Sequence, residues 1–182
     1  MKKYILILAV AFFRIPIYGQ IYLAKTCEIA FFSASPLENI EAINTSSKPL
    51  LNIATNDVQV KISMSGFIFK KPLMQEHFNE NYAESEKFPN AIFKGKINEK
   101  IDFSKDGEYK ATVTGPLELH GVTKERTIEG AIIVKDGLIN LQGKFNIHIA
   151  DHGIKVPSLY VKNIAEDVMV KINASLEPFK KK

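Results

Sequence analysis

The sequence predicts an all-β fold, in which an antiparallel sheet closes into a barrel with one short helical insertion. Residues 138–149 alternate between apolar and polar side chains, which is the period of a strand with one dry face and one wet face. The dipeptides Asp106-Gly107 and Asp136-Gly137 readily form tight hairpin turns. Many short strands joined in this way form either a barrel or a sandwich. A barrel is favoured because glycines inside strand-like runs let a sheet bend and curl shut: Gly66, Gly95, Gly130 and Gly143.

Residues 1–19 are predicted to be a secretory signal peptide. Two lysines precede an apolar run over residues 4–13, which is too short for a membrane span of about 20 residues. The alternative is that this run forms a buried first strand. With the signal peptide removed, residues 20–182 form one domain with no transmembrane segment and a periplasmic or secreted location.

Charge argues against a nucleic-acid partner. The chain has 24 Lys and Arg against 20 Asp and Glu, a formal charge of +4. Removal of the signal peptide takes away the three charges of Lys2, Lys3 and Arg14, so the charge falls to +1. A phosphate-binding surface needs a concentrated excess of Lys and Arg, so we expect no nucleic-acid binding.

The first half of the mature chain is predicted to form four strands. Cys27 precedes the first of them and is the only cysteine, so no intramolecular disulfide can form. We expect Cys27 to be a small, half-buried strand residue. The four strands are residues 28–33, 40–44, 48–53 and 58–69, with turn residues such as Ser35-Pro36 between them.

The second half is predicted to form strands joined mainly by hairpins. Asp106-Gly107 is expected to link residues 100–103 to 109–114, and Asp136-Gly137 to link 127–134 to 138–149. Further strands are predicted at residues 92–97 and 168–176. Period two assigns alternate residues to the inner face: Val58, Val60, Ile62, Ile139, Leu141, Phe145, Ile147, Val168, Val170 and Ile172.

Residues 72–89 interrupt the strands with a polar and aromatic segment of another character. Met74, Phe78 and Tyr82 recur at a spacing of four, so short helical turns would place them on one face. We expect this face to lie over one mouth of the barrel, where it would cover an apolar opening.

Residues 72–89, with the sequence PLMQEHFNENYAESEKFP, resemble the signature of the YceI-like polyisoprenoid-binding family. A second matching element is the run from Leu119 through His120 and Gly121 to Thr123. The resemblance implies a lipocalin-like, eight-stranded antiparallel barrel that holds a long apolar ligand. Residues 25–28 and 35–42 depart from the commonest pattern, so the chain resembles a divergent branch of that family.

The resemblance and the inward pattern together imply an exported protein that binds or carries a polyisoprenoid or a related amphiphile, such as a quinone-like lipid or a fatty-acid derivative. The oligomeric state is left open, with a homodimer as one alternative. The expected ligand-binding residues are Val60, Ile62, Phe67, Phe69, Met74, His77, Phe78, Asn79, Tyr82, Phe88, Phe93, His120, Leu141, Phe145 and Ile147.

Two other functions remain to be weighed: a structural barrel with a filled core, and an enzyme that acts on a lipid. The sequence has no G-x-S-x-G nucleophile motif and no phosphate-binding loop. His148, Asp151 and His152 could in principle bind a metal, but their spacing does not imply convergence, and we expect His152 to lie in a surface turn. The sequence therefore predicts no catalytic residue, no metal site and no cofactor.

Overall fold

The computed structural model describes residues 20–34, 39–155 and 166–179. The predicted signal peptide, residues 1–19, lies outside the described residues. The predicted turn at Ser35-Pro36 lies outside them as well.

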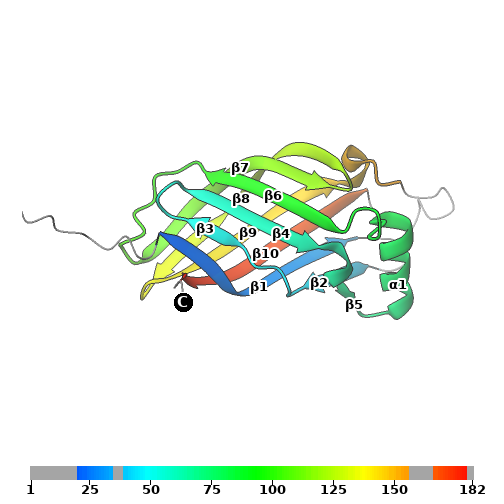
Figure 1. The fold of residues 1–182 in the computed structure, drawn as a ribbon, viewed down its shortest axis with the longest axis horizontal. Helices are drawn as coiled ribbons and strands as arrows, with labels where there is room; N and C mark the ends of the chain where they lie inside the picture. Colours follow the sequence, from blue (N-terminus) through cyan, green and yellow to red (C-terminus); the bar gives the residue numbers. More distant parts are fainter. Residues whose placement is uncertain (1–19, 35–38, 156–165, 180–182) are drawn as a thin grey trace, which may run out of the picture.

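The strands form a closed antiparallel barrel, as predicted (Figure 1). Each strand pairs with the next around the barrel, and the last strand returns to pair with the first. The barrel consists of eight strands, in spatial order β1 (Ile21–Ser33), β3 (Leu50–Asn52), β4 (Asp57–Ser63), β6 (Asn90–Ile97), β7 (Gly107–Leu119), β8 (Val122–Lys135), β9 (Leu138–His148) and β10 (Asp167–Pro178). Two further strands extend the wall from β1 at one end: β2 (Ile40–Asn44) and β5 (Ile68–Phe69).

The inner face of the barrel follows the predicted alternation. All ten residues that were assigned to the inner face belong to the hydrophobic core or pack against it. In β1 the alternation shifts at a bulge between Ala24 and Thr26, so that Ala24 and Cys27 are both buried. Cys27 is 5% exposed, so it is buried rather than half-buried.

Two hairpin turns have the geometry that their residues favour. Asp136 and Gly137 have positive φ (+52° and +75°), as a type I′ turn requires, and they join β8 to β9 as predicted. His120 and Gly121 have φ of +52° and +73° and join β7 to β8 in the same way.

The predicted strand at residues 100–103 is wrong, because the chain forms turns and irregular structure there. Asp102 accepts hydrogen bonds from the backbone N–H and the hydroxyl of Ser104 (3.1 and 2.5 Å), which curls the chain. Glu99 accepts bonds from the backbone N–H and the hydroxyl of Thr112 (both 2.8 Å), which ties this loop to β7. The strand that pairs with β7 on this side is β6.

The predicted strand at residues 58–69 is broken by a single 3₁₀ turn, η1 (Met64–Gly66). The buried side chain of Asn44 donates to the carbonyl of Ser63 (2.9 Å). A Cβ on Gly66 would lie 2.7 Å from Asn44 Nδ2, so only glycine allows this approach. The bend separates β4, which pairs with β6, from β5, which pairs with β2.

The predicted helical insertion is present at one end of the barrel (Figure 1). It consists of α1 (Pro72–His77), with proline in its first turn, followed by one π-helical turn, η2 (Phe78–Tyr82). No helix within the described ranges is long and apolar enough to cross a membrane.

Candidate functional site

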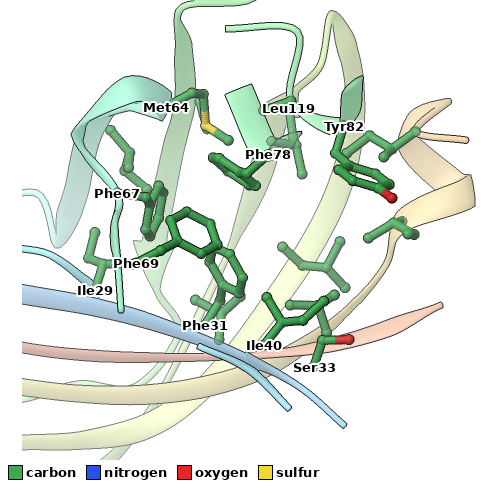
Figure 2. Close-up of a pocket in the computed structure, with 18 of the residues that line it drawn as sticks. Ile29, Phe31, Ser33, Ile40, Met64, Phe67, Phe69, Phe78, Tyr82 and Leu119 are labelled. Atoms are coloured by element: carbon green, nitrogen blue, oxygen red, sulfur yellow. The ribbon is translucent and has the colours of Figure 1, made fainter. Parts of the chain in front are cut away.

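A cavity of about 410 Å³ opens at the end of the barrel that carries the insertion (Figure 2). Its wall is almost entirely apolar, and the polar side chains in it are those of Ser33, His77 and Tyr82. The lining comes from the barrel strands, from β2, η1, β5 and the insertion, and from the 3₁₀ turn η3 (Ile149–His152) with Ile154 after it. An enclosure of this size and composition is typical of a site for a small apolar ligand.

Four phenylalanines form an aromatic cluster on one side of this cavity. The ring of Phe78 lies 5.5 Å from Phe31, 5.9 Å from Phe67 and 5.1 Å from Phe69, centroid to centroid. The ring of Phe31 also lies 5.2 Å from Phe67 and 5.7 Å from Phe69. Offset and tilted pairs at these distances attract one another. The cluster therefore joins η2 to β1 and β5, and it fastens the insertion to the barrel wall.

Nine of the fifteen residues expected from the sequence line this cavity. Met74, Phe78 and Tyr82 lie among them, in agreement with their common face on the insertion. A role for any of the nine as a ligand contact stays a prediction. The nine are Ile62, Phe67, Phe69, Met74, His77, Phe78, Tyr82, Phe145 and Ile147.

The other six lie elsewhere. Val60, Phe93 and Leu141 line a separate void of about 70 Å³ deeper in the barrel. Asn79 is engaged within the insertion, where its amide donates to the Gln75 carbonyl (2.8 Å) and its oxygen accepts from the Ser85 hydroxyl (2.7 Å). The remaining two, Phe88 and His120, pack against each other with ring centroids 4.3 Å apart.

Sequence reasoning missed thirteen residues that line this cavity. Val168 and Val170 had been assigned inward by alternation, so their signal was available. Phe31 and Ile149 each lie two residues from another lining residue on the same run. The other missed residues line the cavity only because segments that are distant in the sequence meet there. The missed residues are Ile29, Phe31, Ser33, Ile40, Met64, Ala83, Ala91, Leu117, Leu119, Ile149, Ile154, Val168 and Val170.

His120 connects three elements beside the pocket. Its Nε2 lies 2.7 Å from the Glu84 carboxylate, which follows the insertion, and its Nδ1 lies 3.2 Å from the His152 carbonyl in η3. Phe88 covers one face of the ring, and Lys87 lies 4.9 Å above the Phe88 ring. The insertion, β7 and η3 each contribute residues to the lining of the cavity. The contacts of His120 therefore hold these three parts of the pocket wall together.

The prediction that His152 lies in a surface turn is wrong, because His152 is 0% exposed. Arg126 can only donate, so His152 Nε2 accepts from the guanidinium (3.3 Å) while Nδ1–H donates to the Val122 carbonyl (3.1 Å). Burial lowers the pKa of His152, and the charge of Arg126 adds to this effect, so the ring is neutral. Arg126 also pairs with Asp151 (2.9 Å), which lowers the pKa of that carboxyl.

The histidines and carboxylates do not assemble a metal site among the described residues. His148 pairs with Asp167 (3.1 Å) and lies 3.7 Å from Glu166 on the outer face. His120 and His152 do meet near Glu84, but neither histidine lines the cavity, and His152 contributes only its backbone carbonyl to His120.

A comparison with models of protein families gives a match over most of the chain. A family model described as YceI-like domain matches residues 32–176. No curated protein matches the chain.

Solved structures share this fold at low sequence identity. A polyisoprenoid binding domain from Saccharophagus degradans, implicated in plant cell wall breakdown, has a TM-score of 0.71 and 14% identity, over 88% of this chain and 99% of that one. BcnA from Burkholderia cenocepacia has a TM-score of 0.69 and 15% identity, over 82% and 95%. A YCEI protein from Campylobacter jejuni has a TM-score of 0.54 and 19% identity, over 75% and 81%.

Proposed function

The chain belongs to the YceI-like domain family, and on that premise we propose that it is an exported protein that binds a polyisoprenoid or a related amphiphilic lipid inside its barrel. The observation that carries the proposal is the apolar cavity of about 410 Å³ under the insertion. Burying an apolar chain there stabilises the complex by about 0.8 kcal/mol for each CH2 group. The structure from Saccharophagus degradans, described as a polyisoprenoid binding domain, supports this ligand class.

The arrangement of the lining supports an amphiphile in particular. Met64 and the four phenylalanines of the aromatic cluster lie on one side of the pocket, whereas Ser33 and Tyr82 lie on the opposite side (Figure 2). His77 is an exposed residue of α1 that also lines the cavity. An isoprenoid tail would occupy the apolar part, with a quinone, alcohol or amide head near these polar side chains.

The main alternative is a structural barrel with a filled core. The observed cavity is evidence against a filled core at the end of the barrel that carries the insertion. Deeper in the barrel, the void lined by Val60, Phe93 and Leu141 is much smaller, at about 70 Å³. Side chains that met across the whole axis would leave no enclosure of drug-like size. The family fold is that of a binding protein, and we propose no catalytic step.

The location that we propose is the periplasm or the extracellular space. The two lysines and the apolar run at the start of the chain support export. Intact-mass analysis of protein from the envelope fraction of its host should find an N-terminus at Gln20 or within a few residues of it. Mature protein that retains Met1 would contradict export.

Native mass spectrometry of protein purified from its own host tests the binding function. We expect an added mass that is lost on denaturation, together with a lipid in the organic extract of the same sample. A second arm offers farnesol and a long polyprenol to delipidated protein. Protein that carries no lipid and takes up neither alcohol would favour the filled scaffold.

A further inference from the structure

The outer surface of the barrel carries apolar side chains where β1, β2 and β5 lie side by side, at the end that holds the insertion (Figure 1). Ile43 of β2 lies opposite Ile68 of β5, and the two side chains are 42% and 62% exposed. On its other side, Ile43 is paired with Ala30 of β1. These residues form one apolar row across three strands, and β5 is the free edge of the sheet.

A second apolar pair lies beside this row. Phe32 of β1 is paired with Met169 of β10, and both are half-buried. The chain neighbours of Ala30, Phe32, Ile68 and Met169 line the cavity, so these four side chains point outward. None of the five outward residues belongs to the hydrophobic core or packs against it. We call them the apolar outer face: Ala30, Phe32, Ile43, Ile68 and Met169.

Two lysines lie opposite each other at one border of the apolar outer face. Lys171 of β10 is paired with Ala30 on one side and with Lys144 of β9 on the other, and both lysines are exposed. Like charges directly opposite each other destabilise a sheet. Glu129 of β8 lies opposite Lys144, but neither lysine forms an ion pair with any residue that the structure describes. The pair therefore indicates an anionic partner at this border.

The other border and the small area disfavour a second copy of the chain as the partner. Lys70 follows β5 and pairs with Glu41 (3.3 Å), and Pro72 lies two residues further on. Lysine and proline beside a short edge strand hinder pairing with another strand. The face covers roughly 15 Å across four strands and about 7 Å along them. A stable protein interface buries about 800 Å² on each partner, which is far more.

We propose that the apolar outer face docks on a lipid bilayer with anionic headgroups. Phe32, Ile43 and Ile68 enter the boundary between headgroups and acyl chains, while Lys144 and Lys171 face the phosphates. The contact adds an interaction surface to the proposed function and does not depend on the identity of the ligand. Because the inner face of the same strands lines the cavity, docking holds the pocket wall against the membrane, in which an isoprenoid ligand dissolves.

Co-sedimentation of the purified protein with vesicles tests this proposal. One set of vesicles is phosphatidylcholine alone, and the other contains equal parts of phosphatidylcholine and phosphatidylglycerol. We expect the parent to bind the anionic vesicles at least about fivefold more tightly at low salt, and this preference should shrink at high salt.

Two double variants separate the apolar and the charged contributions. Ile43→Ser with Ile68→Ser should lower the affinity for both kinds of vesicle by about tenfold or more. Lys144→Gln with Lys171→Gln should abolish the preference for phosphatidylglycerol. If the isoleucine double variant does not fold, Ile68→Ser alone tests the same contact at the more exposed of the two positions.

Matched controls come from other parts of the outer surface. Ile21 and Leu138 have similar exposure, 39% and 43%, and lie at the ends of β1 and β9 that are remote from the insertion. Changing both to Ser should leave vesicle binding as in the parent. Lys94 and Lys96 are exposed on β6, and changing both to Gln should keep the preference for phosphatidylglycerol.

The membrane contact and the proposed function fail in different ways. A parent that binds neither kind of vesicle, or a folded isoleucine double variant that binds as the parent does, would overturn the docking proposal. So would a parent dimer, seen by sedimentation velocity, that the same double variant dissociates while vesicles stay unbound. Retention of farnesol without vesicles should be equal in the parent and the double variant. If vesicles bind but no isoprenoid is retained, the proposed function is wrong and the membrane contact stands.

Discussion

Phe78→Ala should loosen the insertion from the barrel and cost about 2–4 kcal/mol of unfolding free energy. Phe78 packs against three other rings at 5.1–5.9 Å, and each such pair contributes about 0.5–1.5 kcal/mol beyond its buried area. A fully buried Phe→Ala change costs about 3–5 kcal/mol. Phe78 is only partly buried, so we expect a loss about 1 kcal/mol smaller than for a fully buried ring.

Urea unfolding followed by far-ultraviolet circular dichroism measures this loss, because the chain contains no Trp. In a domain of this size the loss corresponds to a fall in Tm of roughly 5–15 °C. A double-mutant cycle with Phe31→Ala should give a coupling of about 0.5–1.5 kcal/mol. The control is Leu73→Ala in the same insertion, which is 60% exposed and should change stability by about 0.5 kcal/mol or less.

Lipid binding measured on the folded fraction of Phe78→Ala shows whether Phe78 only anchors the insertion or also contacts the ligand. If Phe78 also contacts the tail, retention of an isoprenoid alcohol should weaken more than the stability loss explains. A loss below about 1 kcal/mol together with zero coupling to Phe31 would refute the aromatic cluster as the anchor of the insertion.

Three more substitutions probe the wall, the junction and the core. Phe145→Asp should lower both Tm and isoprenoid binding, because an unpaired carboxylate in an apolar lining is costly; no change in either would place Phe145 outside the pocket. His120→Asn tolerates the positive φ but loses the contacts with Glu84 and the His152 carbonyl, so urea unfolding should show a loss of about 1–3 kcal/mol, and an unchanged midpoint would contradict that. Burial, helped by Glu28, raises the pKa of Cys27 from 9.0 to about 11. A thiol reagent at pH 8 should therefore label Cys27 only after unfolding, and rapid labelling of folded protein would contradict the burial. The stability of the parent relative to Cys27→Ala should fall between about pH 9 and 11, since the thiol ionises at lower pH in the unfolded chain than in the folded protein.

The sequence by itself determined the fold class, most strands and the inner face of the barrel. Alternation along β9 and β10 predicted which residues point inward, because a strand has a period of two whatever it pairs with. Asp136-Gly137 predicted its own turn, because the positive φ values are a local property of those residues. The spacing of Met74, Phe78 and Tyr82 similarly predicted one face of the insertion.

Only the tertiary structure decided which strands meet and which interior positions remain empty. Residues 100–103 have a strand-like pattern, yet the side chain of Asp102 turns the chain there. His152 of η3 is buried, and Arg126 and the Val122 carbonyl, both from β8, bind its two ring nitrogens. Val60 and Ile62 look alike in the sequence, but they line different spaces. Whether a barrel position borders a cavity depends on the volumes of side chains from several strands that meet across the axis, and that sum is set by long-range pairing rather than by any local pattern.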